Sequence, residues 1–281
     1  MTIKKPVREI LGKVEELDDK IHSLLMERTD LITSLNQDAK VLNILSLGRE
    51  ASMIKKIVER HEGKFPLNVL TKIFREIYCT SVSLDGDFNI AVYSNEGSKK
   101  YVALAKEYFG SNINYDGYGS LSQVINAVVS EEANLGVISC YNQSNISPWW
   151  TAFDARSESK SPRIVAKLPF ISNQDETNKV EAYVVSMHGP EEAKDSNTLF
   201  SIEASQNISS SSIIEILEAK GFNDVKTHSV ALIDENSKSF LVEIDGQVSE
   251  DDQRLVEIVE EKENIDRLVI VGSYAKTIKI D

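Results

Sequence analysis

The first stretch of the chain, from Val7 to about Gln37, has the pattern of one uninterrupted amphipathic helix. Its apolar residues recur at spacings of three and four, so they form a single stripe along one face. The stripe consists of Val7, Ile10, Leu11, Val14, Leu17, Ile21, Leu24, Leu25, Ile32 and Leu35. At ~1.5 Å per residue, a helix of about thirty residues is roughly 45 Å long, which is too long for a compact module of three helices. We therefore expect another chain to bury this stripe.

Arg28 falls near the apolar stripe, where a core residue would be expected. A charged group inside an apolar seam has to be desolvated and paired. Two interpretations stay open: Arg28 awaits an anionic ligand, or it pairs with an acidic residue across a helical bundle. Arg49 and Glu50 open a second helix, and the carboxylate of Glu50 suits the positive end of that helix dipole.

The pattern of helices and strands divides the chain into three parts. Residues 1–86 are expected to form an all-α module, with the second helix starting at Arg49 and the third at Pro66. Residues 87–192 alternate short strands and helices, which is typical of an α/β domain. Residues 193–281 follow the order strand, helix, strand, strand, helix, strand, which predicts a ferredoxin-like βαββαβ domain.

The same pattern predicts the bounds of the elements after residue 86. The expected helices are 100–109, 121–130, 211–220 and 249–260. The expected strands are 88–93, 113–118, 135–139, 163–168, 181–185, 198–203, 225–233, 239–244 and 266–271. A polar linker is expected over residues 189–197.

Charge is distributed unevenly along the chain, whose net charge is −13. Residues 1–80 hold 14 basic and 12 acidic side chains, whereas the remaining residues hold 17 and 32. No basic surface is large enough to bind nucleic acid, so we exclude that class of function. The nearly neutral N-terminal part can hold a small anion, and the acidic remainder is most simply a solubilising surface.

Cysteine and histidine usage argues against a metal site. Cys79 and Cys140 lack the spacing of metal ligands and are expected to be free thiols in a reducing cytoplasm, and the four histidines show no paired spacing. The N-terminus lacks the apolar region of a signal peptide, and no apolar run approaches the length of a membrane span. We therefore expect a cytoplasmic protein that binds neither metal nor membrane.

Three segments of the N-terminal part resemble the three helices of the all-helical class of chorismate mutase. They are Leu17-Asp18-Asp19-Lys20 with Leu24-Leu25-Met26-Glu27-Arg28, then Gly48-Arg49-Glu50-Ala51, and Ile73-Phe74-Arg75-Glu76-Ile77. The resemblance covers about residues 7–86. It implies an intertwined homodimer, which explains the length of the first helix. It also implies conversion of chorismate to prephenate, a pericyclic rearrangement of a dianion with no covalent intermediate and no metal or organic cofactor.

Catalysis of such a rearrangement needs only positioning and electrostatic stabilisation. The resemblance implies that Arg28 and Arg49 contact the substrate carboxylates and line the pocket. It implies that Glu50 accepts a hydrogen bond from the substrate hydroxyl, and that Ser81 lies near a carboxylate.

Three positions depart from the family pattern. Where the family has an arginine that reaches in from the partner chain, this chain has Leu11, and Arg8, one turn earlier, is the candidate replacement. The lysine that contacts the ether oxygen aligns near Ala39, so its role passes to Lys40. The glutamine at the end of the third helix is Asp85, which can assist only when protonated, because a carboxylate repels the developing oxyanion. Activity is therefore predicted to weaken as pH rises through neutrality, and Asp85→Gln to flatten this dependence.

The remainder of the chain resembles prephenate dehydratase with its C-terminal regulatory domain. The resemblance rests on Phe88-Asn89-Ile90-Ala91-Val92-Tyr93, Gly136-Val137-Ile138, Phe240-Leu241-Val242-Glu243-Ile244-Asp245-Gly246 and Gly272-Ser273-Tyr274. The motifs that carry the chemistry are replaced. The Thr-Arg-Phe and Glu-Asn-Ser motifs read Val180-Glu181-Ala182 and Tyr141-Asn142-Gln143, and the effector motifs read His228-Ser229-Val230-Ala231 and Ser209–Ser212. Glu181 places a negative charge where a dianionic substrate would bind, so we expect a scaffold without dehydratase activity.

We interpret the chain as a cytoplasmic, homodimeric chorismate mutase of phenylalanine and tyrosine biosynthesis. Its expected catalytic residues are Arg28, Arg49, Glu50, Lys40 and Asp85, and its expected substrate-binding residues are Arg8 and Ser81. The C-terminal part is expected to stabilise the dimer or to dock another enzyme of the aromatic pathway. Two alternatives stay open: a non-catalytic regulatory or binding protein of that pathway, and an active bifunctional mutase and dehydratase.

Overall fold

The computed structural model describes most of the chain. The described residues are 5–38, 47–83, 88–95, 99–110, 112–140, 148–153, 161–173, 180–190, 195–261 and 264–280. Lys40 and Asp85, two of the expected catalytic residues, lie outside them, as do residues 141–143.

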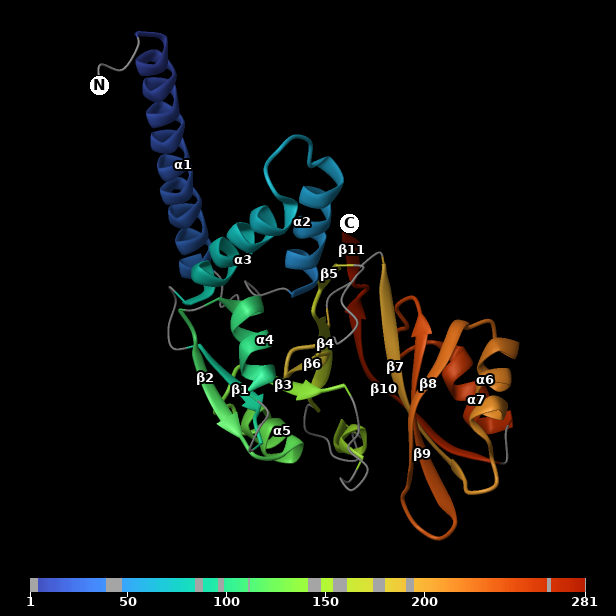
Figure 1. The fold of residues 1–281 in the computed structure, drawn as a ribbon. Coiled ribbons are helices and arrows are strands. Elements are labelled where there is room, and N and C mark those ends of the chain that lie inside the picture. Colours follow the sequence, from blue (N-terminus) through green and yellow to red (C-terminus); the bar gives the residue numbers. More distant parts are fainter. Residues whose placement is uncertain are drawn as a thin grey trace.

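Three helices form the N-terminal part, as predicted. They are α1, Lys5–Asp38, α2, Leu47–Arg60, and α3, Leu67–Ser83. The carbonyl oxygen of Pro66 accepts hydrogen bonds from the backbone N–H groups of Val69 and Leu70, which places this proline at the start of α3. Helix α1 packs against α3 only near its C-terminal end and otherwise projects away from the rest of the molecule (Figure 1).

The apolar stripe of α1 is uncovered in the single chain. Seven of its side chains are between 46% and 63% exposed: Val7, Ile10, Leu11, Val14, Leu17, Ile21 and Leu24. Leu25 and Ile32, nearer the C-terminal end, are half-buried. A projecting helix with so much contiguous exposed apolar surface is typical of an element that is completed by another chain.

Residues after α3 begin with a small parallel sheet. The elements are β1, Asn89–Tyr93, α4, Lys100–Phe109, β2, Asn114–Tyr118, α5, Leu121–Val129, and β3, Leu135–Ser139. Strand β1 pairs in parallel with β2 on one side and with β3 on the other. Ser120 starts α5 with a capping box, because its side chain accepts from the backbone of Gln123 while the Gln123 side chain accepts from the backbone of Ser120.

The chain then adds β4 and β6 to this sheet. A 3₁₀ helix, Trp149–Phe153, precedes β4, Arg163–Leu168, β5, Ile171–Asn173, and β6, Ala182–Ser186, and β5 belongs to a separate two-stranded sheet. Strand β6 pairs antiparallel with β3 and with β4.

The C-terminal part has the predicted order of strands and helices. Its elements are β7, Ser196–Ser205, α6, Ser210–Ala219, β8, Asn223–Leu232, β9, Ser237–Asp245, α7, Gln253–Glu261, β10, Ile265–Ala275, and β11, Ile278–Ile280. Strand β9 lies between β7 and β8, and both pairings are antiparallel. The buried residues of α6 and α7 pack with Phe200, Phe240 and Val242 in a core on one face of these strands.

Some predicted bounds were wrong. Helix α7 begins at Gln253 rather than at Ser249, because residues 249–252 form a turn in which the Asp252 N–H donates to the Ser249 carbonyl at 3.1 Å. The Asp252 carboxylate then accepts from the Arg254 N–H at 3.0 Å, as a side chain at a helix N-terminus does. Strand β7 begins inside the expected linker, and strands β5 and β11, which pair with each other, were not predicted.

One sheet of nine strands runs through the part of the chain after α3. Its order is β2-β1-β3-β6-β4-β10-β7-β9-β8 (Figure 1). Strand β10 joins the two ends, because it pairs antiparallel with β7 and meets β4 at Gly272 and Ile164. A Cβ atom at Gly272 would collide with the backbone of Ile164, so only glycine allows this approach.

Helices α2 and α3 pack against this α/β part. Helix α3 packs against α4, and α2 packs against β4 and β10. Lys55 of α2 forms an ion pair with Asp195, which directly precedes β7.

Candidate active site

Arg28 lies in the C-terminal half of α1 and reaches α3. Its Nη1 donates to the Ser81 hydroxyl at 2.5 Å and to the Ile77 carbonyl at 3.5 Å. Its guanidinium carbon lies 5.2 Å from the centroid of the Tyr78 ring, within the range of a cation–π contact. Burial lowers the pKa of Arg28 from its usual value. Two expected site residues, separated by 53 positions in sequence, are thus in direct contact.

Glu50 lies in the first turn of α2, and only 6% of the residue is exposed. Neither of its carboxylate oxygens has a hydrogen-bond partner in the part of the chain that the structure describes. Burial raises the pKa of Glu50 to about 7, although the positive charge of Arg75 opposes this rise. A buried carboxylate with free acceptor positions is costly, so it marks a place where a donor group can bind.

The charges of both groups act on Tyr78 of α3. Burial raises the pKa of Tyr78, the charge of Arg28 lowers it, and the charge of Glu50 raises it. Arg28 and Glu50 therefore act on the same ring from α1 and α2. The three helices bring one cation, one hydroxyl and one unpartnered carboxylate to a common place, which suits a small ligand that carries both carboxylate and hydroxyl groups.

Among the other expected residues, Arg8 is far from this place. Arg8 is exposed on α1, and twenty residues of helix, roughly 30 Å, separate it from Arg28. Arg49 has an exposed side chain beside the buried Glu50. Lys40 and Asp85 lie outside the described residues.

Arg75 is a buried residue of this region to which the sequence analysis assigned no role. Only 6% of Arg75 is exposed, and its Nε and Nη2 have no hydrogen-bond partner among the residues that the structure describes. The signal was present in the sequence, because Arg75 stands among the apolar residues Phe74, Ile77 and Tyr78 of α3.

In the dehydratase-like part, Glu181 is paired rather than alone. It lies 3.3 Å from the Lys167 ammonium. Trp149 and Trp150 are buried, and the Trp150 indole N–H donates to the Ser239 hydroxyl of β9 at 2.7 Å. The two tryptophans therefore belong to the core that joins the 3₁₀ helix to the C-terminal strands.

A polar cluster crosses the C-terminal strands near this core. The Glu243 carboxylate of β9 accepts from the Tyr274 hydroxyl and lies 3.1 Å from Nε2 of His228. Burial opposes ionisation of Glu243, but these hydrogen bonds outweigh it and lower the pKa of Glu243 to about 2. His228 is therefore partnered. Cys79 and Cys140 are both free and buried, and burial raises the pKa of each thiol.

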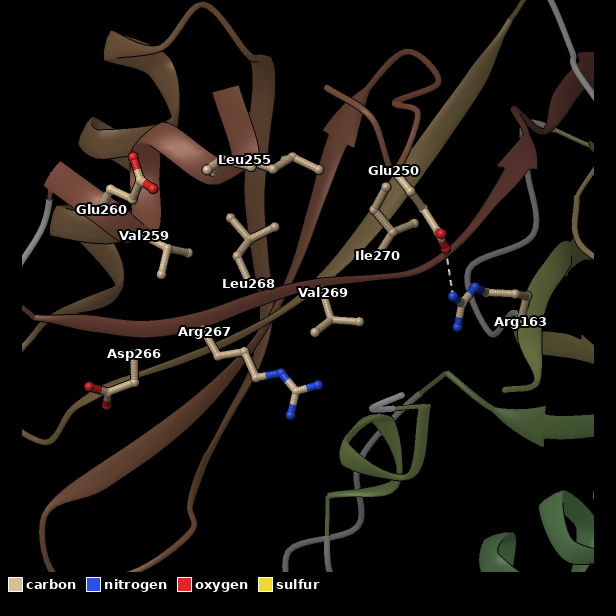
Figure 2. A pocket seen from close by; sticks show the side chains of 11 residues that line it. Arg163, Glu250, Leu255, Val259, Glu260, Asp266, Arg267, Leu268, Val269 and Ile270 are labelled. Atoms are coloured by element: carbon tan, nitrogen blue, oxygen red, sulfur yellow. Dashed lines mark hydrogen bonds and ion pairs between the residues drawn. The ribbon is translucent and has the colours of Figure 1, made fainter. Parts of the chain in front are cut away.

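A separate pocket lies between α7 and β10. Figure 1 shows that these two elements lie away from α1 and α3. The volume of the pocket is about 520 Å³. Leu255, Leu268 and Ile270 line it, and Arg163 and Glu250 form an ion pair of 2.6 Å at one end (Figure 2).

Two negative findings concern the described part of the chain. No helix in it is long and apolar enough to cross a membrane. No group of three or more His, Cys, Asp or Glu side chains in it is arranged to hold a metal ion.

Comparison with known proteins identifies the helical part. Residues 10–85 match the family model of chorismate mutase type II. A bifunctional chorismate mutase/prephenate dehydratase from Aquifex aeolicus is 27% identical over 142 residues, which are 48% of this chain and 39% of the relative. One from Stutzerimonas stutzeri is 24% identical over 139 residues, or 47% and 38% of the two chains. The aligned stretch thus spans about two fifths of the length of these relatives.

The solved structures that match this chain have lower sequence identity to it than these relatives do. Prephenate dehydratase from Streptococcus mutans matches 69% of this chain and all of its own, at 14% identity and a TM-score of 0.46. GqqA, described as a novel type of quorum quenching acylase, matches 68% of this chain and 96% of its own, at 18% identity and a TM-score of 0.47. Both TM-scores are low, so the match over residues 10–85 carries the assignment.

Proposed function

From the chorismate mutase type II domain at residues 10–85 we infer that this chain is an isomerase that converts chorismate to prephenate in phenylalanine and tyrosine biosynthesis. The observation that carries this inference is the contact of Arg28 with Ser81, together with the unpartnered carboxylate of Glu50, whose charge acts on the same Tyr78 as that of Arg28. Arg28 binds a substrate carboxylate beside Ser81, and Glu50 accepts the hydrogen bond of the substrate hydroxyl. Neither role needs a metal or an organic cofactor.

The active form in this proposal is a homodimer. The exposed stripe of α1 supports it, because two such helices can bury their stripes against each other. A dimer can also bring a further cation to Arg28. Arg8, which is too far away along its own helix, would enter the site from the partner chain, and Lys40 and Arg49 would complete the cationic lining.

The mechanism follows from charge and geometry. Arginine side chains hold the two carboxylates of the dianion in the reactive diaxial shape, which converts binding into orientation. Donors near the ether oxygen stabilise the negative charge that grows there as the bond breaks. In this proposal Lys40 is one donor, and a protonated Asp85 is the other.

The pH dependence has two opposing parts. Asp85 assists only when protonated, so its contribution falls as pH rises. Glu50, whose pKa is about 7, accepts a hydrogen bond best when ionised, so its contribution rises with pH. We expect a bell-shaped profile of kcat/KM, from which Asp85→Gln removes only the decline at high pH.

A first experiment tests the activity itself. The loss of chorismate absorbance is followed with purified full-length protein, Arg28→Ala and Glu50→Gln. We expect wild-type turnover well above the buffer rate, and a fall of at least about 100-fold in kcat/KM for Arg28→Ala, because a charged hydrogen bond to the substrate is worth about 3 kcal/mol. Lys56→Ala, on the exposed side of α2, is the matched control and should retain wild-type turnover. A wild-type rate equal to that of buffer would instead favour the non-catalytic binding protein.

The α/β part is proposed to be a scaffold of the prephenate dehydratase kind without dehydratase activity, followed by a ferredoxin-like regulatory domain. The strand order β10-β7-β9-β8 with α6 and α7 on one face supports the second statement. Glu181 in place of the arginine supports the first, although its pairing with Lys167 offsets part of its charge. Phenylpyruvate formation from prephenate would establish the rival bifunctional enzyme. We place the protein in the cytoplasm, where this part can also dock another enzyme of the pathway.

A further inference from the structure

The contact between α3 and α4 joins the mutase helices to the α/β part. The guanidinium carbon of Arg75, on α3, lies 4.4 Å from the centroid of the Tyr108 ring, on α4. The Cys79 thiol donates to the carbonyl oxygen of Tyr108 at 3.7 Å. A Cβ atom at Gly110 would lie only 2.6 Å from Oε2 of Glu76, so the end of α4 is also tightly packed on α3.

Arg75 is oriented by the ring of Tyr108 rather than by an acidic partner. Its Nε and Nη2 have no hydrogen-bond partner within the described residues, and the same holds for both carboxylate oxygens of Glu50. Arginine stays charged in proteins, so Arg75 is a buried positive charge. Its charge acts on the buried carboxyl group of Glu50, with which it makes no direct hydrogen bond in the described part of the chain. The stacking with Tyr108 fixes where that charge sits.

The other titratable groups that face Glu50 are neutral near pH 7. They are Tyr78 and Cys79 on α3 and Tyr108 on α4, and burial raises the pKa of each. The charge of Arg28, on α1, also acts on Tyr78. Among the described residues, Arg75 is the group whose charge favours the ionised form of Glu50.

We propose that Arg75, held on the ring of Tyr108, is a positioning residue that favours the ionised form of Glu50 in the mutase site, so that α4 of the α/β part contributes to mutase catalysis. This inference rests on the proposed function. It gives the α/β part a role that needs no dehydratase activity: a residue of α4 sets the charge state of a residue in the mutase site through one intervening side chain.

The expected sign follows from the charges. Removing the cation leaves only burial acting on Glu50, so the Glu50 carboxyl group holds its proton to higher pH. If the midpoint rises by one pH unit from about 7, the ionised fraction at pH 7 falls from about one half to about one tenth, a fivefold loss. At a pH above the raised titration midpoint of Glu50, the activity of the variant recovers. Removal of a residue with a purely structural role would not give such a recovery.

The experiment measures kcat/KM against pH for the full chain in an Asp85→Gln background, so that the decline at high pH does not overlap. The variants are Arg75→Gln, Arg75→Lys and Tyr108→Leu. We expect Arg75→Gln to lose at least fivefold at pH 7 and to recover by pH 9, and Arg75→Lys to restore most of the wild-type profile because it keeps the charge. Tyr108→Leu, like Arg75→Gln, should shift the rise of kcat/KM to higher pH.

The matched control is Lys72→Gln. Lys72 of α3 pairs with Glu107 of α4 at 3.2 Å, so it joins the same two helices, but both side chains are exposed. Its removal should leave the pH profile unchanged.

A second readout does not need chorismate. The carboxyl carbon of Glu50 is followed by NMR in ¹³C-glutamate-labelled full chain and assigned with Glu50→Gln. The pH midpoint of the Glu50 titration should rise in Arg75→Gln and Tyr108→Leu and should be unchanged in Lys72→Gln. An unmoved midpoint in either folded variant overturns the role of Arg75, whatever the activity. A moved midpoint in a protein without mutase activity instead overturns the proposed function alone. If circular dichroism shows that Arg75→Gln does not fold, the same measurements on Tyr108→Leu and Arg75→Lys test the role of Arg75.

Discussion

Glu50 and Glu243 show how the surroundings of a buried carboxyl group decide its charge. Each is less than 10% exposed. Glu50 has no hydrogen-bond donor within the described residues, and burial raises its pKa to about 7. Glu243 accepts from Tyr274 and faces His228, and its pKa is about 2. The Glu50 carboxylate can thus accept a hydrogen bond from a bound hydroxyl group. The Glu243 carboxylate is instead occupied by contacts that join β8, β9 and β10.

This difference gives a prediction for Glu243→Gln. The folded-state pKa of Glu243 lies below the usual value of 4.5, so its stabilising contribution is complete above pH 4.5 and is lost as pH falls through 2. The interval of about 2.5 pH units corresponds to about 3 kcal/mol. Glu243→Gln should therefore lower the free energy of unfolding by about 3 kcal/mol at pH 7 and by clearly less at pH 3.

Urea unfolding at both pH values, followed by tryptophan fluorescence, measures this loss. Glu215→Gln, an exposed position on α6, is the control and should have little effect at either pH. An equal loss for Glu243→Gln at pH 7 and pH 3 would mean that the carboxylate charge is not what matters.

Sequence reasoning could name Arg28, Ser81 and Glu50 as candidates because each carries a side chain type that the family chemistry requires. It could not assign Arg75, because the importance of that side chain depends on Tyr108, which is 33 positions later and on a different module. Burial of Glu50 was equally invisible in the sequence, since a glutamate in the first turn of a helix is usually explained by the helix dipole.

At the scale of elements, α1 is the one whose sequence pattern is least satisfied by its own chain. Its stripe repeats at helical spacing over most of the 34 residues, yet its large apolar side chains are exposed. A helix rarely keeps such surface in water, because each buried large apolar side chain contributes about 1.5–3 kcal/mol.

We predict that Leu17→Asp together with Ile21→Asp converts a dimer to a monomer. Two buried apolar side chains per chain are replaced by charges, which should weaken association at least about 100-fold. Light scattering after size-exclusion chromatography should give twice the chain mass of 31.4 kDa for the wild type and a single chain mass for the variant at micromolar concentration. Asp19→Lys, which points away from the stripe, should remain dimeric. A wild type that runs as a monomer would contradict the whole dimer proposal.

The long helices and the buried strands were predictable because their apolar spacing is regular over many residues. The three-residue strands β5 and β11 were not, because so short a strand carries no periodicity and exists only through its partner. The start of α7 was also misplaced, since the acidic residues before Gln253 continue its polar face while the chain is still in a turn.

At the scale of the whole molecule, the nine-stranded sheet depends on one glycine. Gly272 lets β10 touch the backbone of Ile164 on β4 while β10 also pairs with β7. Within the described residues, the two ends of the sheet meet only through this strand.

Gly272→Ala should therefore separate β10 from β4. Forcing a methyl group against backbone atoms costs about 1–3 kcal/mol, and the thermal midpoint should fall by several degrees. Gly189→Ala is the control, because a Cβ atom there meets nothing within 4 Å. Differential scanning calorimetry of both variants measures the effect. Equal midpoints would show that the junction tolerates a wider spacing than the backbone contact indicates.

The seating of α3 on α4 has a consequence for anyone who wishes to work with a minimal catalytic fragment. A fragment that ends at Ser83 would lack Tyr108 and Gly110, which pack against α3. Arg75, Glu76 and Cys79 would then face water. Such a fragment would contain the three helices that match the family model and would still lack α4, against which α3 packs. The shortest useful version of the protein is set by α4, not by the boundary at which the family match ends.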